Sequence, residues 1–239
     1  RKQSIEKVYR HAPFNGKSPE LSQELYSRLD KGEINAVKDY QKAYQIKQPD
    51  SNLIDKLEKI PWERNILVFV GATIVGKGLQ TIIVSLPFIL KKHPDTHLVV
   101  IGSGVSRELF EALVYAIASK NETLLDALVD KGYDLDPIEL SGSWSDVKSF
   151  LSDDNNKTEL FANGSTLLEH VHFLGRLDHD LLRCVFPCSD VGFFPSIVPE
   201  AYANVLFEAL SIGVFPMASY FTGLACGLDA LVPCLGHEL

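Results

Sequence analysis

The apolar run Ile66-Leu67-Val68-Phe69-Val70, followed by Gly71, decides the fold of this chain of 239 residues. An uninterrupted run of this length is typical of a strand that is buried on both faces, as in a parallel sheet. Four further runs follow, at residues 97–101, 171–174, 190–194 and 214–218. Each is closed by a glycine, a proline or a serine, residues that commonly begin turns. We therefore expect five buried strands.

Segments with the apolar spacing of helices separate these strands. They lie at residues 78–90, 107–120, 122–129, 146–151, 181–185 and 200–212. Because strands alternate with helices, crossover connections join the strands, which predicts an α/β fold with a Rossmann-like, doubly wound parallel sheet. Ligands bind such sheets outside the carboxyl ends of the strands.

The Rossmann-like domain is predicted to span residues 61–239. Residues 130–164 are polar and irregular, and we interpret them as an insertion with one helix and a solvated loop at residues 153–156. Residues 1–60 are rich in Lys, Glu, Asp and Gln, and apolar residues recur at helical spacing within residues 22–29 and 34–44. We interpret this region as an interdomain linker whose short amphipathic helices lie on the surface.

Composition excludes several classes of protein. The net charge of −8 argues against a general affinity for nucleic acid or for anionic lipid. No apolar run reaches the roughly 18 residues that a membrane-spanning helix needs, and no secretory signal is visible. The four cysteines lack the paired spacing of a metal site. We expect a cytoplasmic protein with free, mostly buried thiols, no metal, no nucleic-acid partner and no integral membrane segment.

The most specific motif is the segment EAYANVLFE at residues 200–208, in which Glu200 and Glu208 are separated by seven residues. Eight positions on a continuous helix are a little over two turns, so both carboxylates are expected to face one cleft. Glutamates at this spacing are also common on solvated helix faces, and the pair alone is a weak signal. Tyr202 and Phe207, on the same predicted helix, are expected to pack in the core.

Further motifs occur in order around this pair. They are FVG at residues 69–71 with KGL at 77–79, LVVIGSG at 98–104, and VHFLG at 171–175 with DVGFFPS at 190–196. The ordered set, from Ile66 to Asp229, resembles the C-terminal donor-binding domain of the group 1 (family 4) retaining glycosyltransferases, which have the GT-B fold. The resemblance implies an enzyme that transfers a sugar from a nucleoside diphosphate to an acceptor with retention at the anomeric carbon.

The resemblance also implies roles for individual residues. Lys77 is expected to contact the diphosphate, Glu200 the hydroxyls of the donor sugar and Glu208 the ribose. The remaining donor-site positions that it implies are Gly71, Gly175, Arg176, Asn204, Thr222 and Gly223. Lys77 and Glu200 are the expected catalytic residues, and neither a cofactor nor a metal is expected beyond the donor substrate.

The acceptor in this family is held by an N-terminal domain, and we interpret both chain ends, Arg1 and Leu239, as cuts in a longer protein. The fragment alone is therefore expected to bind donor but to transfer little or no sugar.

One position departs from the family pattern. The first strand of the family usually ends in Gly-Arg, whereas this chain has Gly71-Ala72. A bidentate guanidinium contact to the developing charge of the leaving group is thus missing, unless Arg176 replaces it. Two alternatives stay open at this point: a non-catalytic binding or scaffold domain with the same architecture, and a sugar-nucleotide epimerase of the same fold.

Overall fold

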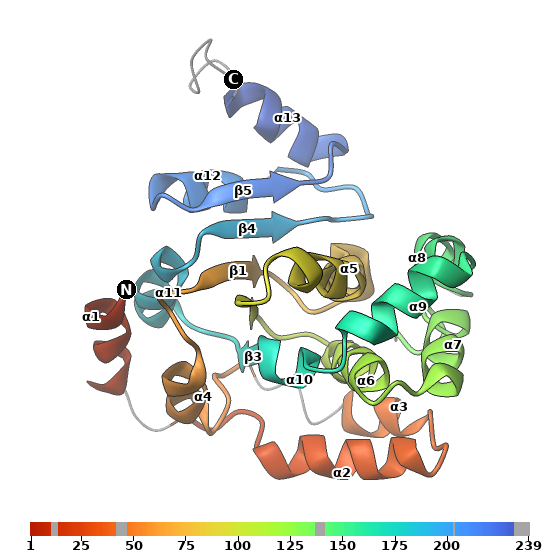
Figure 1. The fold of residues 1–239 in the computed structure, drawn as a ribbon. Helices are drawn as coiled ribbons and strands as arrows, with labels where there is room; N and C mark the ends of the chain where they lie inside the picture. Colours follow the sequence, from red (N-terminus) through yellow and green to blue (C-terminus); the bar gives the residue numbers. More distant parts are fainter. Residues whose placement is uncertain (11–13, 42–46, 137–141, 203, 232–239) are drawn as a thin grey trace.

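A computed structural model describes residues 1–10, 14–41, 47–136, 142–202 and 204–231. Within these residues a sheet of five strands runs in the order β3-β2-β1-β4-β5 (Figure 1). The strands are β1 (Asn65–Val70), β2 (Thr96–Ile101), β3 (Val171–Gly175), β4 (Val191–Phe194) and β5 (Phe215–Ala218). All neighbouring pairs are parallel. The predicted strands and the doubly wound parallel sheet are confirmed.

Helices before and between the strands complete the fold. They are α1 (Lys2–Glu6), α2 (Pro19–Asp30), α3 (Ala36–Gln41), α4 (Leu53–Lys59), α5 (Leu79–Lys92), α6 (Arg107–Ala118), α7 (Glu122–Asp130), α8 (Ser145–Leu151), α9 (Asp154–Asn163), α10 (Leu167–His170), α11 (His179–Val185), α12 (Asn204–Ser211) and α13 (Thr222–Leu231). Short 3₁₀ helices are η1 (Val8–Arg10), η3 (Val75–Lys77) and η4 (Phe186–Cys188). In the part of the chain that is described, no helix combines the length and apolar character needed to cross a membrane.

The apolar core has one layer on each face of the sheet, because successive side chains of a strand point to opposite faces. Leu67 and Phe69 of β1 belong to the layer formed with α2, α3, α5, α6, α7 and α9. Ile66 and Val68 belong to the other layer, formed with α1, α4, α11, α12 and α13. Both faces of β1 are therefore buried, as its uninterrupted apolar sequence predicts.

The N-terminal 60 residues contribute to both core layers. Helices α2 and α3 confirm the two helices that were predicted there, whereas α1 and α4 were not predicted. Leu25 and Leu53 are fully buried, so the apolar faces of α2 and α4 form part of the core. Helix α2 packs against α6, at the opposite end of the molecule from α13 (Figure 1). The domain boundary at residue 60 stays a prediction.

The helix predicted at residues 200–212 begins later than expected, at Asn204. The backbone N–H of Glu200 donates to Thr222 Oγ1 at 2.9 Å, and the Glu200 carbonyl accepts from the N–H of Gly223 at 2.9 Å. Both backbone groups of Glu200 are thereby used outside a helix. The prediction that one continuous helix carries Glu200 and Glu208 is wrong for this reason.

The predicted insertion holds more structure than expected. Helix α8 confirms the helix predicted at residues 146–151, but the run at residues 153–156 begins α9 and is not a solvated loop. Asp153 is the N-cap of α9, and its side chain accepts a hydrogen bond from Asn155 N–H at 2.8 Å. An acidic N-cap satisfies backbone donors that the helix leaves free, and α9 packs along α5.

A buried network of charges joins the N-terminal segment to α6. Arg107 donates from Nη1 and Nη2 to the two oxygens of Asp50, both at 2.6 Å, and from Nε to Glu111 Oε1 at 2.9 Å. Lys17 donates to Glu111, and Lys56 donates to Asp50 and to the carbonyl of Phe173. Burial opposes the ionisation of Asp50, but Arg107 and Lys56 together outweigh it and lower the pKa of this carboxyl.

Replacement of Asp50 by alanine is expected to lower the free energy of unfolding by about 3–5 kcal/mol, because Arg107 would be left buried without its bidentate partner. Urea unfolding measures this loss. The matched control is Asp95→Ala, which breaks the Arg64–Asp95 pair, where both side chains are more than half exposed. Its loss is expected to stay below about 1 kcal/mol. Equal losses in the two variants would contradict a special role for the buried pair.

Candidate functional site

A cavity of about 340 Å³ lies at the carboxyl ends of β1 and β4. These strands are neighbours in the sheet, but the chain proceeds from β1 to β2 on one side and from β4 to β5 on the other. Such a point of reversal leaves a crevice in which doubly wound proteins bind ligands. The cavity is lined by Phe69, Val70, Gly71, Ala72, Lys77, Phe194, Ser196, Glu200, Tyr202, Asn204, Val205 and Leu224.

Four of the predicted site residues, Gly71, Lys77, Glu200 and Asn204, meet in this cavity. The ammonium group of Lys77 donates to Glu200 Oε1, and the two side chains are 31% and 20% exposed. No other charged residue is among the described lining residues, so the side-chain charges of the cavity balance. A polyhydroxylated ligand would meet both a cationic donor and an anionic acceptor here.

Glu200 is held by contacts to its side chain and to its backbone. Ser196 Oγ lies 2.8 Å from Glu200 Oε1, while the carbonyl of Ser196 accepts a hydrogen bond from Ser219 Oγ at 2.7 Å. Two hydrogen bonds fix the backbone of Glu200 to the start of α13: its N–H donates to Thr222, and its carbonyl accepts from Gly223. Two of the predicted positions, Thr222 and Gly223, therefore orient Glu200 and do not line the cavity.

The turn at Thr222 and Gly223 is tightly constrained. Thr222 has a φ of 46°, in the left-handed region that side chains with a branched Cβ rarely adopt. A Cβ added to Gly223 would lie 2.4 Å from the carbonyl oxygen of Glu200, so only glycine allows this approach. Backbone strain of this kind collects at functional sites, where the surrounding structure holds it in place.

Lys77 is the last residue of η3, and Gly78 separates it from the start of α5. Gly78 has a φ of 76°, and a Cβ added there would lie 1.9 Å from the carbonyl oxygen of Pro195. Asp136, from the predicted insertion, accepts hydrogen bonds from Val75 N–H at 3.0 Å and from Ser106 Oγ at 2.7 Å. The turn that carries Lys77 is thus held against β4 by a glycine contact and against the insertion by a buried carboxylate.

Glu208 and Tyr202 lie differently from the sequence-based expectation. Glu208 is exposed on α12 and is not among the residues that line the described cavities, so its contact with a ribose stays a prediction. Tyr202 was expected in the core, but it is 61% exposed, stacks on Phe207 and lines the cavity. The missing helical turn before Asn204 moves Tyr202 out of the core and into the crevice.

A second cavity of about 370 Å³ adjoins the first. The two share Val70, Gly71 and Ala72 as a common wall. The remaining lining residues of the second cavity are Lys47, Ile101, Gly102, Ser103, Arg176, Leu177 and Leu182. The predicted position Arg176 lies here, apart from Lys77. Gly175, which precedes it with a φ of 78°, lines neither of the two cavities.

Two residues of the crevice were not assigned from the sequence. Ser196 belongs to a quoted motif, but only the structure brings its hydroxyl against Glu200. Lys47 lies outside the predicted domain and in no recognised motif, so its place beside Arg176 had no sequence signal. Among the described residues, no group of three or more His, Cys, Asp or Glu side chains could hold a metal ion.

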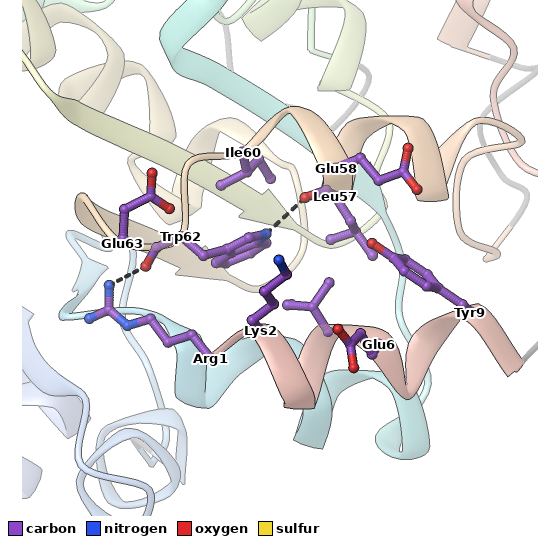
Figure 2. A pocket seen from close by; sticks show the side chains of 10 residues that line it. Arg1, Lys2, Glu6, Tyr9, Leu57, Glu58, Ile60, Trp62 and Glu63 are labelled. Atoms are coloured by element: carbon purple, nitrogen blue, oxygen red, sulfur yellow. Dashed lines mark hydrogen bonds between the residues drawn. The ribbon is translucent and has the colours of Figure 1, made fainter.

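A cavity of about 560 Å³ lies far from the crevice, between α1 and α4 (Figure 2). Trp62 lies in its wall and donates from Nε1 to the carbonyl of Leu57 at 2.8 Å. Arg1 donates to the carbonyl of Trp62 at 2.6 Å. Its lining residues come from the N-terminal segment and hold no arrangement of nucleophile, base and orienting group.

Three histidines stack near the amino ends of β2 and β3. His97 Nδ1 lies 3.1 Å from His172 Nε2, and the ring of His97 also stacks on His170 at 4.6 Å between centroids. Burial, assisted by the neighbouring His97, lowers the pKa of His172 to about 3. The amino ends of the strands lie opposite the crevice, and none of the three histidines lines either of its two cavities.

The comparisons with known proteins show partial structural likeness. No protein-family model and no curated protein matches the sequence. The chain is similar to HepE from Anabaena in complex with UDP and glucose, with 16% identity, 73% of this chain and 35% of that chain covered, and a TM-score of 0.41. It is similar to sucrose-phosphate synthase from Thermosynechococcus elongatus, with 20% identity, 74% and 32% covered, and a TM-score of 0.40.

A glycosyltransferase from Rickettsia africae is also similar, with 18% identity, 77% and 42% covered, and a TM-score of 0.41. The chain spans about a third of the length of the HepE and sucrose-phosphate synthase chains.

Gly78→Ala is expected to destabilise the protein more than Gly213→Ala. The two glycines have φ values of 76° and 80°, so the cost of a left-handed alanine, about 1–2 kcal/mol, applies to both. Only at Gly78 does the added Cβ collide with backbone, because nothing lies within 4 Å of it at Gly213. Thermal unfolding of the two variants measures the difference. Equal destabilisation would show that Pro195 yields without cost.

Acid is expected to weaken the fold through His172. Its pKa is lowered in the folded state, so its contribution to stability is complete above pH 6.5 and is lost as the pH falls toward 3. The loss between pH 7 and pH 5.5 is about 1 kcal/mol. Urea unfolding across this range should show a shallower pH slope in His172→Gln. The control His179→Gln changes an exposed histidine and should keep the wild-type slope; an unchanged slope in His172→Gln would contradict the assignment.

Proposed function

We propose that this chain is the donor-binding domain of a retaining glycosyltransferase. Its donor is a nucleoside diphosphate sugar, and the acceptor is held by a second domain that closes over the crevice. No metal takes part, because the charge of the leaving group is met by side chains.

The observation that carries this proposal is the meeting of Gly71, Lys77, Glu200 and Asn204 in one cavity at the point where the strand order reverses. Gly71 and Lys77 lie more than 120 positions before Glu200 and Asn204 in the sequence. All four belong to the motifs that resemble those of the glycosyltransferases.

Departure of a diphosphate from the anomeric carbon is the difficult event in such a reaction. Negative charge grows on the leaving phosphate oxygen, and a cation placed there lowers the barrier. Lys77 supplies that cation in the proposal. Glu200 accepts hydrogen bonds from the hydroxyls of the donor sugar, and its rigid attachment to Ser196 and Thr222 keeps it in place without reorganisation.

The ion pair between Lys77 and Glu200 is consistent with these roles. With no donor bound, each group satisfies the other, which lowers the free energy of a partly buried charge. A donor sugar replaces this contact: its phosphate takes Lys77 and its hydroxyls take Glu200. The complete donor is then expected to bind more tightly than either half, because either half alone leaves one charge of the pair without its partner.

A second function is favoured by Ala72, which lies in the wall of both cavities where the family has arginine. The loss of that guanidinium suits a domain that binds a nucleotide sugar without transferring the sugar. Transfer activity of the complete protein separates the two functions, since both require the donor to bind. An epimerase of the same fold would need an acid and base pair in the crevice, where Glu200 is the only carboxylic acid among the described lining residues.

Calorimetric titration with UDP, GDP, ADP and their glucose, mannose and N-acetylglucosamine conjugates tests the proposal. One nucleotide is expected to bind with micromolar to millimolar affinity. Glu208→Ala should weaken that binding roughly ten- to a hundredfold, because a charged acceptor to the ribose is worth about 1.5–3 kcal/mol. The control Glu58→Ala removes an exposed glutamate of α4 and should have no effect.

Glu200→Gln separates a donor-sugar site from a general nucleotide site. The variant should lose affinity for the sugar conjugate relative to the free nucleoside diphosphate, because the carboxylate touches the sugar and its removal leaves Lys77 free for phosphate. Parallel losses for both ligands would argue against contact between Glu200 and the sugar. Failure of all the nucleotides to bind to this chain and to the complete protein would overturn the proposed function.

A further inference from the structure

The two adjoining cavities differ in charge. In the cavity at the ends of β1 and β4, Lys77 is neutralised by Glu200. The neighbouring cavity is lined by two cations, Lys47 and Arg176, and no acidic residue is among its described lining residues. In a chain whose net charge is −8, a cavity with two positive charges and no compensating carboxylate is a local reversal of sign. Such a concave region attracts anions.

Neither cation is committed to another group. No described ion pair or side-chain hydrogen bond involves Lys47 or Arg176, whereas most of the other arginines in the described residues pair with carboxylates. Both side chains are exposed at the rim of the cavity, so they can turn toward a ligand without leaving a buried partner behind. The two residues are therefore available for an anion.

Lys47 reaches this place because the N-terminal segment runs beside the end of β3. Pro49 and Gly175 form an antiparallel bridge, and the N–H of Arg176 donates to the carbonyl of Gln48 at 3.2 Å. The N–H of Asp50 donates to the carbonyl of Leu174 at 3.0 Å. These backbone hydrogen bonds align the segment with the end of the strand.

The buried side chain of Asp50 then fastens this segment, since Arg107 and Lys56 both bind it. The backbone directly after Lys47, at residues 48–50, is held from two sides, by β3 and by α6. Backbone contacts of the neighbouring residues therefore place Lys47 beside Arg176, without a contact of the lysine side chain itself.

Ala72 links this cavity to the donor site. It lies in the wall that the two cavities share, with Lys77 on one side and with Lys47 and Arg176 on the other. An arginine at this position would reach into the shared region, but alanine brings no charge. Apart from Lys77, the cations among the described lining residues of the two cavities are Lys47 and Arg176.

We propose that Lys47 and Arg176 bind the diphosphate of the nucleotide and replace the arginine that is missing at Ala72. This inference rests on the proposed function and assigns to the chain a diphosphate subsite that is built partly by the N-terminal segment. The diphosphate lies across the wall formed by Gly71 and Ala72, so that the sugar extends toward Glu200. Lys77 completes the contact once the sugar has taken Glu200.

Titration of the wild type and of Lys47→Ala, Arg176→Ala and the double variant tests this subsite. The probes are UDP, GDP and ADP, the matching nucleosides, and inorganic pyrophosphate. The double variant should bind the preferred nucleoside diphosphate about a hundredfold more weakly, since each charge-assisted contact contributes roughly tenfold. Affinity for the nucleoside should not change. Lys92→Ala, at the end of α5 beside the amino end of β2, is the matched control and should bind as the wild type does.

Restoration of the missing arginine gives an independent readout. Ala72→Arg, introduced into the double variant, should recover at least tenfold of the lost affinity for the nucleoside diphosphate, because it places a guanidinium in the shared wall. The thermal midpoints of all variants are measured first. The charge-reversed variants Lys47→Glu and Arg176→Glu should abolish binding of pyrophosphate, which makes the result independent of small changes in stability.

The outcomes distinguish this inference from the proposed function. Wild-type affinity of the double variant for the nucleoside diphosphate overturns the subsite and leaves the donor site standing. Loss of pyrophosphate binding in the double variant, in a protein that binds no nucleotide, supports the subsite and overturns the donor site. No binding of pyrophosphate or nucleotide by the wild type overturns both.

Discussion

The bidentate pair between Asp50 and Arg107 is the contact on which the arrangement of this molecule depends. Both side chains are almost fully buried, and each would be costly in the interior without the other. Asp50 belongs to the N-terminal segment and Arg107 to α6, so the pair holds two parts of the chain together at the edge of β3. The backbone bridge between Pro49 and Gly175 forms beside it and brings Lys47 to the crevice. A region that resembles a linker by composition thereby becomes part of the candidate site.

The crevice is formed mainly by loops at the strand ends, and each loop is held by a different set of contacts. Glu200 is fixed through Ser196 and through the strained turn at Thr222, whereas the turn before α5 is fixed by the close approach of Gly78 to Pro195. These constraints position the charges before any ligand arrives, which reduces the reorganisation that binding requires. When no ligand is bound, the ion pair between Lys77 and Glu200 gives each of these charged groups a partner.

The predicted insertion, residues 130–164, also helps to position the charged residues of the crevice. Asp136 accepts hydrogen bonds from Val75 and Ser106 and so ties the turn that carries Lys77 to the start of α6. Helix α9 packs along α5, the helix that follows this turn. A segment that is irregular by composition therefore helps to hold Lys77 in position. Helix α9 within this segment packs against a helix that is distant in sequence.

The sequence by itself determined the parallel sheet, because runs such as residues 66–70 must be buried on both faces wherever they lie. It also pointed to Lys77 and Glu200, because their motifs are local. It did not determine that α12 begins only at Asn204, since the backbone of Glu200 is taken by Thr222, 22 positions later. Only the tertiary structure placed Lys47 beside Arg176 and Tyr202 in the crevice. The physical reason is that buried ion pairs and backbone contacts between distant segments leave no periodicity in the sequence, whereas burial of a strand or a helix does.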